Sequence, residues 1–186
     1  SSRSAPAGAK ATAGSGQFLA TGYAAQQKAV VMLKNADDLL PASAGRKLYV
    51  EGIAKEAAAA FGTVVDDPKA ADLAILRVAS PTTTYPYGGA FAGGGGMRGG
   101  GTPPPPPPIS PYGITLAYGN AANWQVLENI RKVAASGTKT VVIVNMDKPV
   151  ILTEFIDQVA GVYGAFGASD AALLDVVFGK AKVTGK

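Results

Sequence analysis

Two short apolar runs constrain most strongly what this chain can fold into. Residues 73–79 (LAILRVA) are almost continuously apolar, and residues 138–146 (TKTVVIVNM) carry a run of β-branched side chains. Runs of this length and composition predict strands that are buried on both faces, as in parallel sheets covered by helices. The chain is therefore expected to build a sheet with a helical layer on each side.

Helical patterns alternate with these strands. Residues 120–137 place apolar side chains at helical spacing, and Gly137 ends the pattern. Ser169 is a suitable N-cap for a last helix at 169–179, and Asp170 lies favourably at the positive end of its dipole. Further helices are predicted at 21–34, 54–62 and 149–159, and further strands at 47–53 and 160–167. The alternation predicts an α/β fold: an open, mostly parallel sheet of about six strands with helices on both faces, an α/β sandwich with flavodoxin-like layering.

The alternation is interrupted by a long Gly/Pro-rich stretch, residues 80–119. Its centre is a run of glycines followed by six consecutive prolines, so a flexible segment precedes a stiff polyproline II segment. We interpret 80–119 as a loop insertion within a single α/β sandwich domain at 20–186, preceded by a flexible leader or linker remnant at 1–19. Two interpretations of the insertion stay open: a tolerated low-complexity loop, or a flap over a ligand site at the carboxyl end of the preceding strand.

The composition excludes several kinds of site. The sequence contains no His and no Cys, which excludes a Ser-His-Asp triad, a cysteine nucleophile and metal sites made from imidazole or thiolate ligands. We therefore expect no metal ion and no cofactor. The net charge is +4, but the lysines and arginines are spread out, which argues against nucleic acid as a partner. No apolar run reaches the roughly 18 residues that a membrane helix needs, so we expect no membrane partner.

A nucleotide-binding function is the weakest of the alternatives. Gly94, Gly96 and Gly99 match the spacing G-x-G-x-x-G, but they lie well beyond the preceding strand and no predicted helix follows them directly. A flavodoxin-like nucleotide-binding domain would need a phosphate-binding turn between a strand and the next helix, and the sequence predicts none.

Four segments of the chain resemble, in the same order, motifs of one enzyme family. Residues 24–41 (AAQQKAVVMLKNADDLLP) are similar to the motif that opens its C-terminal domain, and residues 164–186 (GAFGASDAALLDVVFGKAKVTGK) are similar to the motif that closes it. Residues 72–81 and 138–152 resemble two of its strands. On these motifs the chain resembles the C-terminal α/β sandwich domain of family 3 glycoside hydrolases, the β-glucosidase and β-xylosidase group.

The resemblance implies that the chain is one part of a longer enzyme. In this family a TIM-type barrel provides the nucleophilic Asp, and the sandwich domain usually lends the acid/base Glu from the loop after the strand that matches 73–79. A retaining mechanism needs the two carboxylates about 5–5.5 Å apart. Here that loop holds no carboxylate, since no Asp or Glu occurs from Leu73 to Leu127. We therefore assign no catalytic residue to this chain.

Other side chains of the insertion are the candidates for substrate binding. Tyr85, Tyr87 and Arg98 stand in place of the usual acidic loop; aromatic faces stack on sugar rings, and Arg donates hydrogen bonds to hydroxyls. Lys34 and Asn35 match the Lys-Asn of the opening motif and are interpreted as structural. The family's acid/base position is matched by none of the four glutamates, Glu51, Glu56, Glu128 and Glu154.

Two functions follow from the resemblance. The first is the C-terminal domain of a β-glycosidase, inactive alone, which helps to form the substrate site for hydrolysis of β-linked glucosides or related glycosides. Its partners would be the catalytic barrel domain of the parent enzyme or a partner chain, and a β-linked oligosaccharide or glycoside. An apolar surface facing the barrel would also permit a homo-oligomer. The second function is a non-catalytic carbohydrate-binding or structural α/β domain. By resemblance, the protein would be periplasmic or secreted.

Overall fold

The computed structural model describes residues 15–83 and 114–183. Its centre is a six-stranded sheet with the strand order β1-β6-β5-β4-β2-β3. The edge strand β1 pairs antiparallel with β6, and all other neighbours pair parallel. The strands are β1 (Val30–Asn35), β2 (Arg46–Glu51), β3 (Gly62–Val64), β4 (Leu73–Ala79), β5 (Thr140–Asn145) and β6 (Gly161–Ala165). The predicted α/β class and the mostly parallel sheet are confirmed.

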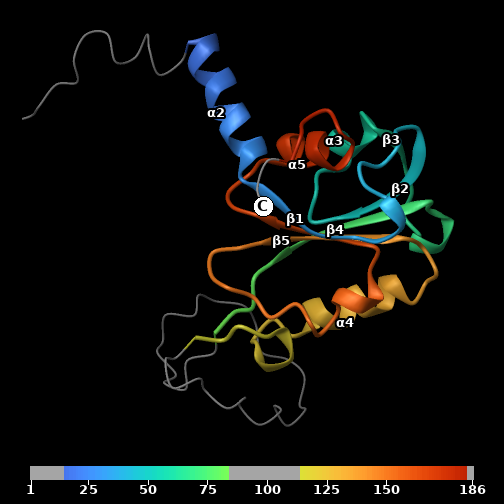
Figure 1. The fold of residues 1–186 in the computed structure, drawn as a ribbon. Helices are drawn as coiled ribbons and strands as arrows, with labels where there is room; N and C mark the ends of the chain where they lie inside the picture. The colour runs from blue at the N-terminus through green and yellow to red at the C-terminus, as the bar shows by residue number, and fades with distance from the viewer. Residues whose placement is uncertain (1–14, 84–113, 184–186) are drawn as a thin grey trace, which may run out of the picture.

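Helices lie on both faces of this sheet. The helices are α2 (Gly16–Lys28), α3 (Lys55–Ala59), α4 (Gln125–Ala134) and α5 (Asp170–Val177). Figure 1 shows α3 and α5 on one face and α4 on the other. Along β4, Leu73 and Ile75 pack in the cluster that includes α5, whereas Ala74 and Leu76 pack in the cluster that includes α4. All four side chains are fully buried, which confirms the double burial predicted from this run.

The first helix is shorter than predicted and is followed by a strand. α2 ends at Lys28, although a helix was expected over 21–34. Val30–Asn35 instead form β1, hydrogen bonded to β6. The β-branched side chains of Val30 and Val31 favour the extended backbone, and Val30 is fully buried. The helix prediction is wrong from Val30 onward because the apolar residues there belong to a partly buried edge strand and not to a helical face.

The helix predicted at 149–159 is also wrong. This stretch is mostly irregular, with one short 3-10 helix, η4 (Ile156–Gln158). The Ile151 N–H donates to the Leu116 carbonyl at 2.9 Å. This hydrogen bond ties residue 151 to a distant part of the chain, and only isolated turns follow it, such as the one closed by the Ile156 N–H and the Leu152 carbonyl at 2.9 Å.

Two further boundaries differ from the prediction. α2 begins at Gly16, inside the leader expected at 1–19, and residues 1–14 lie outside the described part of the chain. The helix expected at 54–62 is α3, which ends at Ala59, and the short strand β3 that follows was not predicted. Among the described residues, no helix is both long and apolar enough to cross a membrane.

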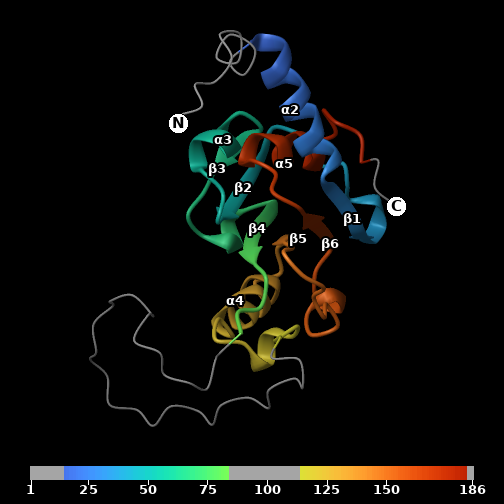
Figure 2. The same ribbon diagram turned by 90° about the vertical axis from the view of Figure 1, so that its left-hand side faces the viewer.

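α2 projects away from the sheet, as Figure 1 and Figure 2 show. None of its residues is buried. Tyr23 packs against the core cluster that includes α5, and the Tyr23 hydroxyl and the Gln27 amide both donate to Asp175 of α5, at 2.7 and 3.0 Å. At its other end Phe18 and Leu19 are 59% and 64% exposed. α2 thus carries an uncovered apolar surface.

The opening and closing motifs of the chain meet at the amino edge of the sheet. The Ala42 N–H donates to the Val177 carbonyl at 2.8 Å. Gly179 follows α5 with φ +74°, and a Cβ added to it would lie 2.8 Å from the Cβ of Pro41. Position 179, directly after the C-cap residue Phe178, is therefore a glycine for both conformational and steric reasons.

Candidate functional site

The ends of three neighbouring strands form a hollow at the carboxyl edge of the sheet. Ala79, Asn145 and Ala165 lie side by side in register at the ends of β4, β5 and β6. Ligands of open α/β sheets bind outside the carboxyl ends of the strands. A cavity of about 360 Å³ opens at this place, lined by Arg77, Ala79, Ser80, Asn145, Met146, Asp147, Ala165 and Gly167. We take it as the candidate site.

A larger hollow, of about 640 Å³, lies at the opposite, amino edge. Its lining includes the turn residues Asp37 and Asp38, which have φ of 54° and 50°. It does not lie where the chain topology places ligands, so we give preference to the smaller cavity.

One carboxylate faces the candidate site. Asp147 follows β5, is exposed, and is the only acidic residue among the described residues that line the cavity. The hydroxyl of Ser80, which follows β4, donates to its Oδ1. This hydrogen bond, with smaller contributions from the Asp147 backbone and from Lys148, lowers the pKa of the Asp147 carboxyl. The site therefore carries an ionised carboxylate at neutral pH.

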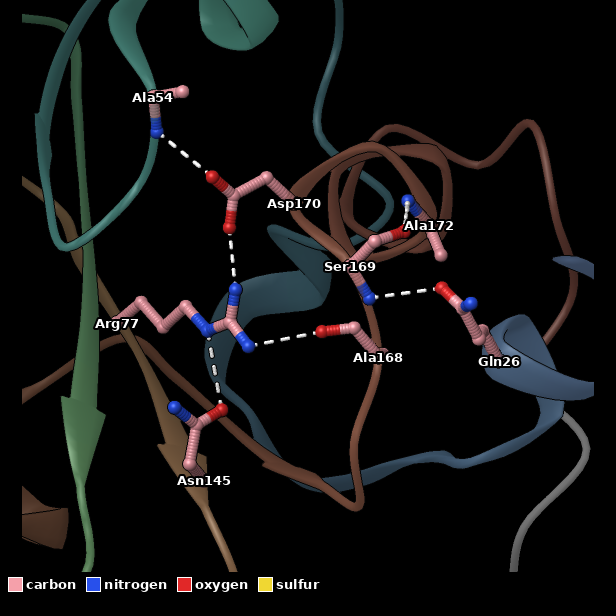
Figure 3. A network of polar contacts seen from close by, with 8 residues as sticks. All are labelled: Gln26, Ala54, Arg77, Asn145, Ala168, Ser169, Asp170 and Ala172. Carbon is pink, nitrogen blue, oxygen red and sulfur yellow. Dashed lines mark hydrogen bonds and ion pairs between the residues drawn. The ribbon is translucent and has the colours of Figure 1, made fainter.

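At the wall of the cavity, Arg77 connects the sheet to α5 (Figure 3). Its guanidinium forms an ion pair with Asp170 and donates to the Ala168 carbonyl at 2.9 Å. Its Nε donates to Oδ1 of Asn145 at 3.1 Å. The other oxygen of Asp170 accepts from the Ala54 N–H at 2.9 Å, at the start of α3. Arg77 is thus held on one side by the helical layer and holds Asn145 on the other.

The N-terminal end of α4 holds the chain where it leaves the cavity. Asn123 accepts from the Thr82 N–H at 2.7 Å and donates to the Ser80 carbonyl at 3.1 Å. The Thr115 N–H donates to Oγ1 of Thr83 at 3.0 Å. The described residues on the two sides of 84–113 are therefore tied to each other.

The chain that returns from the insertion is anchored by Tyr118 and Glu154. Tyr118 is fully buried, and its hydroxyl donates to the Ala79 carbonyl at 2.7 Å. Burial, with the nearby Glu154 charge, raises the pKa of Tyr118 above its ordinary value. The Glu154 carboxylate accepts from the Tyr118 and Gly119 N–H groups at 2.6 and 2.8 Å. Glu154 is therefore a structural cap, in accord with its lack of a match to the family's acid/base position.

Glu51 is also engaged in structure. The Tyr49 hydroxyl donates to one of its oxygens and the Asn129 amide to the other. The hydrogen bond to Glu51, followed by burial, raises the pKa of Tyr49 to about 12. A hollow of about 520 Å³ adjoins this cluster, but both carboxylate oxygens are already occupied.

The predicted substrate-binding residues Tyr85, Tyr87 and Arg98 lie outside the described residues. Asn35 supports the structural interpretation of the Lys-Asn pair, because its side chain bonds the backbone of Leu40 at 2.8 and 2.9 Å.

The other member of the Lys-Asn pair is bonded as well. Lys34 donates to the Ile156 carbonyl at 2.6 Å.

The described part of the chain contains no group of three or more acidic side chains arranged to hold a metal ion.

Sequence reasoning missed Asp147. The family's acid/base is expected from the insertion after β4, whereas this carboxylate follows the neighbouring strand β5. The signal was available, because Asp147 directly follows the strongest predicted strand, and parallel strands end at one edge.

Comparison with known proteins identifies the family. No protein-family profile matches the chain. The chain is 30% identical to a probable β-glucosidase C of Aspergillus flavus over 97% of its length. It is 31% identical to the periplasmic β-glucosidase/β-xylosidase of Dickeya chrysanthemi over 87% of its length. The chain is a C-terminal α/β sandwich domain of the family 3 glycoside hydrolases. This family 3 domain spans 26% and 22% of the lengths of these two relatives, about a quarter.

Solved structures agree on the fold. β-Glucosidase 3B from Thermotoga neapolitana, solved in complex with glucose, has a TM-score of 0.62 and 13% identity, covering 91% of the family 3 domain and 30% of that chain. A GH3 β-glucosidase from Bifidobacterium adolescentis has a TM-score of 0.56 and 16% identity, covering 88% of the domain and 27% of that chain.

Proposed function

We propose that this chain is the C-terminal domain of a β-glucosidase or a related β-glycosidase. In that enzyme it helps to form the substrate site together with a catalytic barrel domain that supplies the nucleophile. The observation that carries the proposal is the similarity to β-glucosidases over most of the chain, while the chain spans about a quarter of their length.

The carboxyl edge of the sheet is the part of the domain that we assign to the glycoside. Sugar hydroxyls both donate and accept hydrogen bonds, and the cavity offers partners of both kinds in Ser80, Asn145 and Asp147. The uncovered side chains Phe18 and Leu19 suit contact with another domain of the parent enzyme or with a partner chain.

The domain contributes binding rather than proton transfer in this proposal. A general acid of a glycosidase needs a raised pKa, so that it carries its proton at working pH. The pKa of Asp147 is lowered, so its carboxylate suits the acceptance of hydrogen bonds from hydroxyls. The acid/base and the nucleophile are then supplied by other parts of the enzyme.

Hydrolysis of aryl β-glycosides tests the proposal. The chain is assayed alone and with the catalytic barrel of its parent enzyme, and we expect hydrolysis only with both. Hydrolysis by the chain alone would contradict our placement of the nucleophile.

A carbohydrate-binding or structural domain is the second candidate, because no carboxylate occurs between Leu73 and Leu127. Sugar binding without hydrolysis in either assay would favour it.

We also propose a periplasmic or secreted location, supported by the name of the Dickeya relative. Fractionation of cells that express the full-length parent protein tests it.

A further inference from the structure

We propose that Asn145 and Asp147 form a donor–acceptor pair that binds two adjacent hydroxyls of a neutral sugar, and that Arg77 positions Asn145 for this role. The inference deepens the proposed function and rests on it, since it names the residues and the ligand chemistry of the same cavity.

Asn145 supplies the donor. Its Oδ1 is occupied by Nε of Arg77 at 3.1 Å, which fixes the side-chain amide with its NH₂ group turned away from the guanidinium (Figure 3). No described residue accepts a hydrogen bond from that NH₂ group, although Asn145 lines the cavity. An unused donor at a cavity wall is a group that a ligand can satisfy.

Arg77 cannot easily turn away from Asn145. Its remaining nitrogens bond Asp170 and the Ala168 carbonyl, and its side chain is only 20% exposed. The guanidinium fork is planar, so the contacts to the α5 side fix the direction of Nε as well. Arg77 therefore acts on the ligand through Asn145 and is a positioning residue.

Asp147 supplies the acceptor. Ser80 donates to Oδ1, and no hydrogen bond from another described residue reaches Oδ2. Its position two residues after Asn145 brings both side chains to the same cavity. A carboxylate held in this way accepts a strong, charge-assisted hydrogen bond from a hydroxyl.

The pair selects one class of ligand. Adjacent hydroxyls of a sugar can accept from the Asn145 amide with one oxygen and donate to Asp147 with the other. Phosphates and carboxylates would be repelled by the Asp147 charge, because Arg77, the cation among the described lining residues, is paired with Asp170. A divalent cation would need more oxygen ligands than the described residues gather here.

Glucose is the probe for the test, at concentrations from below to well above millimolar. Backbone and side-chain amide shifts are followed by NMR in the ¹⁵N-labelled full chain. We expect shifts at residues 77–80 and 145–147 and at the Asn145 side-chain NH₂. Asp147→Asn should weaken glucose binding about tenfold, because a charged hydrogen bond is lost. The control Asp157→Asn changes an exposed carboxylate near the amino end of β6 and should leave the affinity unchanged.

The positioning role has its own readout. In Arg77→Lys the Nε contact is lost, so the Asn145 side-chain NH₂ should no longer shift with glucose, whereas the Asp147 backbone amide still should. Equal glucose responses of this NH₂ group in Arg77→Lys and the unchanged chain would overturn the role of Arg77.

Failure of this inference can be told from failure of the proposed function. Three outcomes would overturn the Asn145–Asp147 pair: glucose changes the amide chemical shifts of other residues only, glucose changes no amide shift, or Asp147→Asn binds glucose with unaltered affinity. If the barrel and the chain together still hydrolyse aryl β-glycosides, the proposed function stands without it. If they do not, the proposed function falls as well.

Discussion

The guanidinium of Arg77, near the end of β4, forms an ion pair with Asp170, the first residue of α5. The side chains of this pair are 20% and 26% exposed, and Asp170 also accepts from the Ala54 N–H. One carboxylate thus joins the central sheet, α5 and the start of α3. We expect this contact to stabilise the fold, and Arg77 also lines the candidate site.

Arg77→Met should lower the free energy of unfolding by about 2 kcal/mol, because charged hydrogen bonds are lost and Asp170 is left without its partner. Urea unfolding measures the change. The control is Lys55→Met at the Lys55–Asp66 pair, whose side chains are 60% and 89% exposed and whose loss should have little effect. An equal loss in both variants would contradict the importance of the partly buried pair.

Gly179→Ala should destabilise the protein more than Gly137→Ala. Both glycines have positive φ, +74° and +88°, so an alanine is strained at either by about 1 kcal/mol. Only at Gly179 would the new Cβ meet another side chain, that of Pro41 at 2.8 Å. We expect a total of about 3 kcal/mol for Gly179→Ala. Thermal and urea unfolding of the two variants provide the test; similar values would show that the contact with Pro41 yields at little cost.

Two buried tyrosines should respond oppositely to loss of their hydroxyls. The Tyr118 hydroxyl donates to the Ala79 carbonyl, so Tyr118→Phe should lower the free energy of unfolding by about 1 kcal/mol. The Tyr163 hydroxyl has no hydrogen-bond partner among the described residues, and burial raises its pKa to about 12. Tyr163→Phe should therefore raise the free energy of unfolding by about 1 kcal/mol. Destabilisation of both variants would indicate a partner for Tyr163 outside the described residues.

Ser80→Ala should raise the pKa of Asp147 towards that of an ordinary aspartate, since the Ser80 hydroxyl is the main cause of its depression. The carboxyl ¹³C shift of Asp147, followed against pH, measures this directly. The folded-state pKa is lowered, so the stabilisation is present above the ordinary aspartate pKa. It is lost as the pH falls through the folded-state value. The stability difference between Ser80→Ala and the unchanged chain should shrink over that acidic range; an unaltered Asp147 pKa would contradict the assignment.

The fold could be predicted where a strand is buried on both faces, because such a strand needs an almost continuous run of apolar residues. The run at 73–79 is apolar on both faces because Leu73 and Ile75 meet one helical layer and Ala74 and Leu76 meet the other. The edge strand β1 was not predictable in this way. It is buried only in part, and its apolar residues continue directly from those of α2, so nothing local separates helix from strand.

The site was less predictable than the fold. Its polar groups follow β4 and β5. The sequence predicts that both strands end at one edge of the sheet, but it does not show that these two strands are neighbours with Ser80 bonded to Asp147. The orientation of Asn145 depends on Arg77, and that of Arg77 on Asp170, far along the chain. This series of hydrogen-bonded side chains can be recognised only in the folded structure, where the strands lie side by side.

Pro41, the last residue of the opening motif, and the adjoining Ala42 lie against Gly179 and Val177 of the closing motif. That contact lies at the amino edge of the sheet, whereas the candidate site lies at the carboxyl edge. Substitutions at the candidate site therefore need not touch the residues that close the domain. The motifs that resemble the family and the proposed binding residues thus lie at opposite edges of the sheet, so family membership does not by itself determine which sugar this site would bind.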